Sequence, residues 1–394
     1  MTLTLAELQF GDLEAFDEAR NHPNYFNLTF VTPDSMSIKA LKNSNKFIVV
    51  GRKGSGKTAI QMHMANCLRE EKYLTRIFSF HNDMSASDYA KIARTQTHIS
   101  VADVVNKKNI FLQYDYRQVW MRSILTFVAE ELLDNDIEND FVSFMIGKKS
   151  ILKNIFEGIS KTVTVKFSAE MKGIAADVGI DLSQFVEDVP LDKFNSIAKE
   201  LFKKHCNKQK MYFFVDELVF SKLDASEDEL KARAAMVRDI IKTSRDLNNF
   251  SHQNHINFHF ICSIRPEIRN LINELDSEVG KIIDGKDVQL NWLTTAKTEF
   301  TLLFEILKKK VTYSANGEKI DFDKFVTKTI TFNRNNMTLD EFIKTNTWGR
   351  PRDIVRLLIS IAKKIQMQLE FQKMKLKMRL MNTQEHQQKN LQTN

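Results

Sequence analysis

The sequence has few cysteines, few prolines and no long apolar run, and each shortage argues against a class of protein. The three cysteines, Cys67, Cys206 and Cys262, are far apart, so they predict neither a disulfide framework nor a zinc site. No apolar stretch approaches the roughly 18 residues of a membrane-spanning helix, and residues 1–20 are acidic, unlike a signal peptide. Five prolines and no internal repeat argue against long linkers and repeat architectures. We therefore expect a globular cytoplasmic protein without membrane association.

A glycine-rich segment at residues 51–58 carries most of the functional information. It fits the phosphate-binding pattern G-x-x-x-x-G-K-[ST], follows an apolar run at 47–50 and precedes a helix-compatible stretch at 59–65. Strand, loop and helix in this order favour polyphosphate binding, because glycines let backbone N–H groups face the ligand and the helix N-terminus adds positive partial charge. We assign nucleotide binding to Gly51, Gly54, Ser55, Gly56, Lys57, Thr58 and Ala59.

The bound nucleotide also needs a metal and a catalytic group. In this pattern Lys57 reaches the β- and γ-phosphates, and the Thr58 hydroxyl ligates Mg²⁺. Asp216 and Glu217 follow an aromatic-rich apolar run at 210–215 and so lie at the end of a buried strand. Asp216 is the expected second Mg²⁺ ligand, and Glu217 the carboxylate that polarises water for attack on the γ-phosphate. The alternative interpretation of Glu217 is a surface charge at a strand end.

The rest of the chain alternates strands and helices, which is typical of a parallel sheet covered on both faces. We predict an α/β fold with a five-stranded parallel P-loop sheet, an insertion and a C-terminal helical lid. The expected divisions are a flanking segment, a core with an insertion at about 138–190, a lid and a basic tail, at residues 1–45, 46–292, 293–360 and 361–394. The expected strands are 47–50, 75–80, 210–215, 256–262 and 288–292, and the expected helices include 116–133, 226–248 and 295–310.

Two further motifs place arginines near the expected nucleotide. Ser263 and Arg265 follow the strand that we expect beside the Asp216 strand, where an arginine can contact the γ-phosphate. Pro351 and Arg352 begin a later helix and, if it covers the nucleotide, would lie near the base and the phosphates. The alternatives are an arginine paired with a surface carboxylate and an ordinary basic helix start.

Together these motifs resemble AAA+ ATPases of the STAND and origin-recognition type, over about residues 10–360. More narrowly, the segment 10–15 ahead of the phosphate loop is similar to a poorly characterised group of bacterial P-loop ATPases. The resemblance implies ATP and Mg²⁺ as cofactors and a site completed at a subunit interface. It also implies nucleotide roles for Lys57, Thr58, Asp216, Glu217, Arg265 and Arg352. The chain lacks the long repeat array and effector domain of large STAND proteins, which puts autonomous signalling in doubt.

The net charge is concentrated near the C-terminus. Residues 361–394 carry seven Lys and Arg and two Glu, a net charge of +5. Such a segment can bind nucleic-acid phosphates weakly, and the alternative is a solvated basic terminus without a partner. The other expected partners are a second copy of the chain, for which Arg245 or Arg269 would be the arginine supplied across the interface, or a separate effector protein.

Two function classes remain open. The first is an ATPase that acts as a nucleotide-driven switch or remodelling motor, with bacterial antiviral defence or DNA transactions as the processes. The second is an ATP-regulated nucleic-acid-binding protein of the replication-initiator type. Only about 34 residues follow Ser360, too few for a winged-helix domain, so the sequence favours the first class.

Overall fold

The computed structural model describes residues 8–33, 38–43, 45–79, 116–146, 164–166, 188–218, 227–292, 301–315, 320–327, 329–332 and 335–368. The chain forms two compact units. The first contains Met1–Asp34, Gly54–Ala59 and Asn291–Asn394, and the second contains Ser35–Lys53 and Ile60–Leu290. None of the helices within the described ranges is long and apolar enough to cross a membrane.

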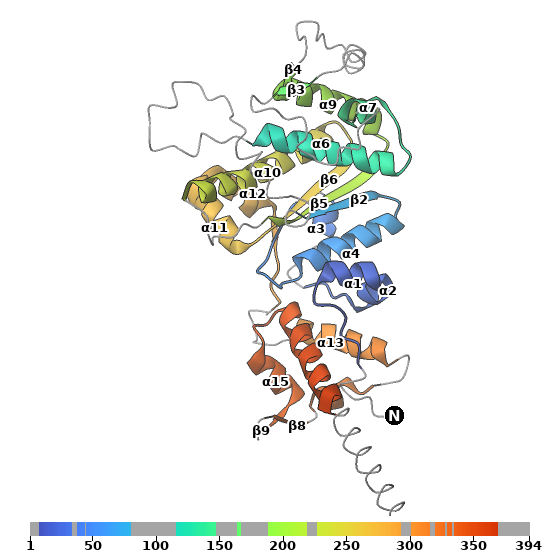
Figure 1. Ribbon diagram of the computed structural model, residues 1–394, viewed down its shortest axis with the longest axis vertical. Helices are drawn as coiled ribbons and strands as arrows, with labels where there is room; N and C mark the ends of the chain where they lie inside the picture. The colour runs from blue at the N-terminus through green and yellow to red at the C-terminus, as the bar shows by residue number, and fades with distance from the viewer. Residues whose placement is uncertain are drawn as a thin grey trace, which may run out of the picture. The chain divides into compact units, whose positions relative to one another are not determined.

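The second unit is built on a five-stranded, all-parallel sheet with the order β2-β5-β6-β1-β7 (Figure 1). The strands are β1 (Ile48–Val50), β2 (Leu74–Ser79), β5 (Lys210–Leu218), β6 (Asn257–Ile264) and β7 (Asp287–Gln289). The predicted α/β class with a parallel sheet flanked by helices is therefore confirmed. The expected strand 288–292 is shorter than predicted and ends at Gln289.

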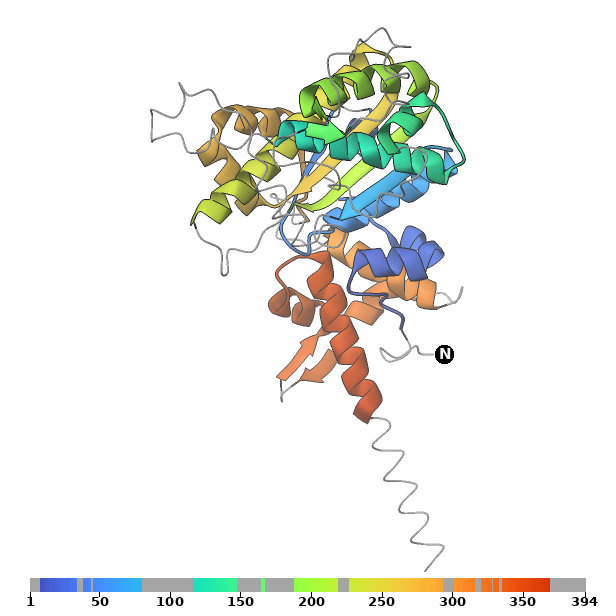
Figure 2. The ribbon, with the colours of Figure 1, turned by 45° about the horizontal axis from the view of Figure 1, so that its top comes forward.

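The handedness of the connections places the helices on the two faces of the sheet. Right-handed crossovers that run in one direction across a sheet put their helices on one face, and a crossover in the opposite direction uses the other face. The step from β1 to β2 runs opposite to the others, so α4 (Lys57–Glu70) covers one face (Figure 2). The other face is covered by α6 (Arg117–Asp134), α7 (Asp140–Ile146), α9 (Leu191–Cys206), α10 (Glu227–Gln253), α11 (Pro266–Leu275) and α12 (Ser277–Lys286).

The strands are apolar on both faces because both faces are covered. Residues 211–215 of β5 are all buried, and Met211, Phe213 and Val215 share one hydrophobic core with α6, α7, α9 and α10. The short elements of this unit are α3 (Ile38–Lys42) and the antiparallel pair β3 (Thr164–Lys166) and β4 (Asp188–Pro190). Most of the predicted insertion at 138–190 lies outside the described residues, and α7, β3 and β4 are its described elements.

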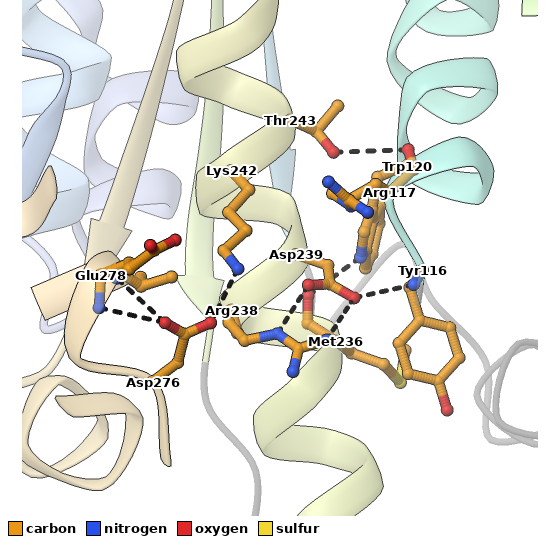
Figure 3. Close-up of polar contacts among 11 residues, drawn as sticks. Tyr116, Arg117, Trp120, Met236, Arg238, Asp239, Lys242, Thr243, Asp276 and Glu278 are labelled. Atoms are coloured by element: carbon orange, nitrogen blue, oxygen red, sulfur yellow. Dashed lines mark hydrogen bonds and ion pairs between the residues drawn. The ribbon is translucent and has the colours of Figure 1, made fainter. Parts of the chain in front are cut away.

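Helix α10 is the brace that ties the covering helices together (Figure 3). Its buried Asp239 accepts a hydrogen bond from the Tyr116 backbone N–H at 2.7 Å, at the start of α6. The Trp120 indole N–H donates to a backbone carbonyl of α10 at 2.9 Å. Lys242 pairs with Asp276, the N-cap of α12, at 2.7 Å. One long helix thus fixes helices on both sides of it.

The first unit joins N-terminal and C-terminal residues in one hydrophobic core. Leu8, Phe10 and Val31 pack in one cluster with Leu303 and Leu358. The N-terminal part contributes α1 (Ala15–Asn21) and α2 (Pro23–Thr29). The C-terminal part contributes α13 (Thr301–Ser314), α14 (Phe322–Val326), β8 (Thr329–Phe332), β9 (Asn335–Thr338), α15 (Leu339–Asn346) and a helix over residues 351–368. Residues of the predicted lid therefore share a hydrophobic core with residues of the N-terminal segment 1–45, which was expected only to flank the nucleotide-binding domain.

A buried ion pair holds the N-terminal segment of this unit in place. The Lys310 ammonium lies 2.6 Å from a carboxylate oxygen of Glu18 and over the ring of Tyr25, and both charged side chains are buried. Burial lowers the pKa of Lys310 and raises the pKa of Glu18. Gly11, with φ of +77°, lies so close to Glu18 that a Cβ there would overlap the carboxylate. The pair therefore fixes the backbone ahead of α1.

Removing one member of this pair should cost more than removing both. Lys310→Met leaves the Glu18 carboxylate buried without its cation, so we expect a loss of ~3–5 kcal/mol in the free energy of unfolding. The double variant Glu18→Leu/Lys310→Met should recover most of that loss, because no uncompensated charge remains. Urea unfolding of the three proteins measures both quantities. Equal stability of the single variant and the unsubstituted protein would contradict this role.

His259 on β6 gives the second unit a specific response to acid. Its ring lies 4.3 Å from the Tyr212 ring, and its Nε2 lies 3.1 Å from the Asn257 side-chain oxygen. Burial lowers the pKa of His259 to about 4, from 6.5 in the unfolded chain. As the pH falls, protons therefore bind the unfolded state before the folded state. The contribution of His259 to the free energy of unfolding is complete above pH 6.5 and is lost towards pH 4.

We expect His259→Phe to remove that acid sensitivity while keeping an aromatic ring against Tyr212. The unsubstituted protein should lose up to ~3 kcal/mol of unfolding free energy between neutral pH and about pH 4 through this one group. The variant should show a correspondingly flatter profile, measured by urea unfolding across that range. His252→Asn, at an exposed histidine near the end of α10, is the control substitution.

Candidate functional site

The loop between β1 and α4 contains two glycines in the left-handed region and leads directly into a helix. Gly51 continues the sheet, because its N–H donates to the Ile264 carbonyl at 3.1 Å. Gly54 and Gly56 have φ angles of +81° and +87°, in the left-handed region that favours glycine. Helix α4 begins at Lys57, directly after the second of these glycines. The segment predicted from its sequence pattern therefore folds as a turn that leads into a helix N-terminus.

Two residues of the C-terminal part hold consecutive carbonyls of this loop. The backbone N–H of Arg352 donates to the Gly54 carbonyl at 3.4 Å, and the indole N–H of Trp292 donates to the Ser55 carbonyl at 2.7 Å. All these residues belong to the first unit. In a planar trans peptide the carbonyl and the next N–H point in opposite directions. The N–H groups of Ser55 and Gly56 therefore point away from Trp292 and Arg352.

The Ser55 N–H closes the turn at Lys53–Gly54, and no hydrogen bond from the Gly56 N–H is found within the described parts of the chain. The buried hydroxyl of Ser55, a residue that is 3% exposed, also has no hydrogen-bond partner among those residues. An anion at a helix N-terminus can accept hydrogen bonds from backbone N–H groups in such a position.

The packing around the loop is tight at position 54 and ordinary at position 56. A Cβ at position 54 would lie 3.3 Å from the Cβ of Arg352, and one at position 56 would lie 3.7 Å from the Trp292 ring. Lys57 is 8% exposed at the first residue of α4, and Thr58 and Ala59 follow it, half-buried. The positive φ angle favours glycine at both positions, and the close approach of Arg352 is a further reason for glycine at position 54.

The predicted carboxylates lie in the second unit, at the carboxyl end of β5. Asp216 is 3% exposed and accepts a hydrogen bond from the Ser263 hydroxyl on the neighbouring strand β6. The predicted adjacency of these two strands is confirmed by their parallel pairing. Because β6 also pairs with β1, the strand end that leads into the loop lies at the same edge of the sheet. Glu217 belongs to β5, and its side chain lies outside what the structure describes.

The predicted phosphate-binding arginines each have a carboxylate neighbour. Arg265 is the N-cap of α11, and its guanidinium lies 3.9 Å from Glu267. Arg352 follows Pro351 at the start of the 351–368 helix and pairs with Glu14 at 2.8 Å. These contacts match the simpler interpretations of both motifs. A role in phosphate binding requires each arginine to exchange its carboxylate for phosphate.

The two arginines considered for a subunit interface also pair within the chain. Arg245 lies 3.2 Å from Asp246, and its side chain is 41% exposed. Arg269 contacts Asp284 and lies 3.5 Å from Asp287, linking α11 to α12 and to β7. Arg269 is thus part of the unit's own packing, whereas Arg245 lies on the surface.

Two residues that position the site were not predicted. Trp292 was assigned to a strand, and an indole that bonds a loop 237 residues away leaves no local pattern in the sequence. Gln61 was placed within the first helix, where its amide N–H donates to the Val215 carbonyl of β5 at 3.1 Å. A polar residue on an otherwise apolar helix face was the available signal for Gln61.

Comparisons of the chain with protein-family models, with curated proteins and with solved structures found no match. The assignment of function therefore depends on the loop and the carboxylates themselves.

Removing the indole donor tests whether Trp292 orients the loop. Trp292→Phe keeps a buried ring but removes the donor to the Ser55 carbonyl. The peptide between Ser55 and Gly56 can then rotate, and the Gly56 N–H no longer has a fixed direction. We expect affinity for a fluorescent ATP analogue to fall about 10-fold, consistent with the loss of one buried hydrogen bond. Trp120→Phe is the matched control, because Trp120 is also buried and also donates to a backbone carbonyl. If both variants bind the analogue as tightly as the unsubstituted protein, Trp292 does not set the loop.

Proposed function

We propose that this protein is a Mg²⁺-dependent ATPase that acts as a nucleotide-driven switch. The observation that carries the proposal is the orientation of the loop peptides, whose carbonyls are held by Arg352 and Trp292 and whose N–H groups point the other way. That arrangement, ahead of a 14-residue helix and beside the buried Lys57, suits a chain of phosphates.

The residues present fit a magnesium ion as the second component. Thr58 supplies a hydroxyl and Asp216 a carboxylate, which are oxygen ligands of the kind Mg²⁺ prefers. Asp216 is buried, and a buried carboxylate is stabilised by a cation. When bound, Mg²⁺ would neutralise charge on the β- and γ-phosphates and orient them for attack. Ser263 would hold the Asp216 carboxylate in a fixed direction through its hydroxyl.

The proposed reaction is the hydrolysis of ATP to ADP and phosphate. A water oxygen forms a bond to the γ-phosphorus while the bond from that phosphorus to the β,γ-bridging oxygen breaks. Glu217 orients this water and accepts its proton, and Lys57 stabilises the charge that develops on the phosphate oxygens. Arg265 and Arg352 are proposed to exchange Glu267 and Glu14 for phosphate oxygens.

The switch component follows from how the loop is held. The residues that bond its carbonyls belong to the unit that contains α1, α13 and the 351–368 helix. A phosphate that binds the loop N–H groups also moves the carbonyls in the same peptide planes. The hydrogen bonds that those carbonyls accept from Trp292 and Arg352 then change as well. Nucleotide binding therefore changes the packing of the first unit, and a partner protein can recognise that change.

Two substitutions separate binding from hydrolysis. Lys57→Ala removes the cation that neutralises the phosphates, so we expect ATPase activity to fall at least about 100-fold. Glu217→Gln keeps the shape of the side chain but cannot accept the proton, so kcat should fall about 100-fold while ATP affinity is retained. Lys53→Ala removes a charge from an exposed position of the same loop and serves as the control. Turnover by Glu217→Gln at the unsubstituted rate would exclude Glu217 as the base.

A further inference from the structure

Gln61 connects the helix that begins at the phosphate loop to the strand that carries the carboxylates. Its side chain is fully buried, and its amide N–H donates to the Val215 carbonyl at 3.1 Å. Gln61 lies four residues after Lys57 on α4, which is about one helical turn. Val215 immediately precedes Asp216. One hydrogen bond therefore joins the first turns of α4 to the backbone next to the proposed metal ligand.

The hydrogen bond between Gln61 and Val215 lies where the regular pairing of β5 with its neighbouring strands ends. The pairing of β5 with β6 is regular up to Val215, and its register shifts between Val215 and Leu218. On the other side, the pairing with β2 ends at Asp216, opposite Ser79. Asp216 and Glu217 thus lie where the ladders end or shift. A side-chain donor at the Val215 carbonyl fixes the last regular residue before them.

A comparison with Asn248 shows how the Gln61 amide differs from a purely structural one. Asn248, on α10, donates to the Phe260 carbonyl at 2.9 Å and accepts from the Phe260 N–H at 2.9 Å, so both ends of its amide are paired. The amide oxygen of Gln61 is buried and has no hydrogen-bond partner among the described residues. Burying an unpaired oxygen is unfavourable, and an apolar side chain of similar size would avoid that cost. The useful part of Gln61 is therefore its N–H donor.

We infer that Gln61 is a positioning residue that couples the phosphate loop to the carboxylates Asp216 and Glu217. This inference rests on the proposed ATPase function and specifies how the phosphate-binding residues and the carboxylates of that function are linked. When phosphates engage the N-terminus of α4, Gln61 moves with that helix and carries the Val215 carbonyl with it. The direction of the Asp216 side chain then depends on the occupancy of the loop, because it extends from the adjoining peptide.

Gln61→Met tests the coupling, because methionine has nearly the same length and volume but no donor. We expect ATP affinity to change less than about 3-fold, because the loop itself is intact. The value of kcat should fall at least about 10-fold, since small misplacement of catalytic groups is costly. The Mg²⁺ concentration for half-maximal activity should rise about 3-fold or more, because Asp216 is less well held. Asn248→Leu is the matched control and should lower the melting temperature without changing the Mg²⁺ dependence.

Hydrogen exchange gives a second measurement, and its first part uses only the unsubstituted protein. In the unsubstituted protein, a non-hydrolysable ATP analogue with Mg²⁺ should slow amide exchange at residues 215–218, and in Gln61→Met this protection should be lost. Unchanged kcat and Mg²⁺ dependence in Gln61→Met would overturn the coupling, as would equal changes in Asn248→Leu or unaltered exchange at 215–218 with analogue bound. If the unsubstituted protein binds no ATP analogue at all, the proposed function itself fails, and that outcome is distinct from binding without coupling.

Discussion

The direction of two peptide groups determines what the loop after β1 can bind. A glycine-rich loop can point either its carbonyls or its N–H groups towards a ligand, and the two choices attract ions of opposite sign. Here Trp292 and Arg352 bond the Gly54 and Ser55 carbonyls, so the N–H groups take the other direction. The direction of these peptides therefore depends on donors supplied by the C-terminal part of the chain, and the glycines alone do not set it.

The sheet order determines which chemical groups lie at the edge where β1 ends. Strand β6 lies between β1 and β5. Its carboxyl end places Ser263 beside Asp216, at the same edge of the sheet where β1 ends. Parallel strands bring their carboxyl ends to one edge, where ligands bind in sheets of this class. A hydroxyl that holds a carboxylate at that edge limits the conformations of the carboxylate, which suits a proposed metal ligand whose direction must be constant.

Local patterns in the sequence predicted the parts of the structure that depend on local interactions. The apolar runs gave the strands, and the spacing of glycines ahead of Lys57 gave the turn and the helix start, because φ angles and strand burial are properties of short segments. The sharing of a core by Leu8, Phe10 and Leu303 was not predictable in this way. Nor were the bonds of Trp292 and Gln61, which join residues 237 and 154 positions apart. Such contacts are set by how the elements pack.

The ion pair between Arg352 and Glu14 shows how the proposed switch can respond to a ligand at little cost. Glu14 is 60% exposed and the Arg352 side chain 20% exposed, so solvent screens their attraction. Exposed pairs of this kind contribute about 0–1 kcal/mol. A phosphate carries more charge than a carboxylate and matches the two N–H groups of a guanidinium equally well. The arginine can therefore leave Glu14 when nucleotide is bound. Glu14 precedes α1, whose Glu18 is fixed by Lys310, so this exchange changes a contact made by an otherwise anchored segment.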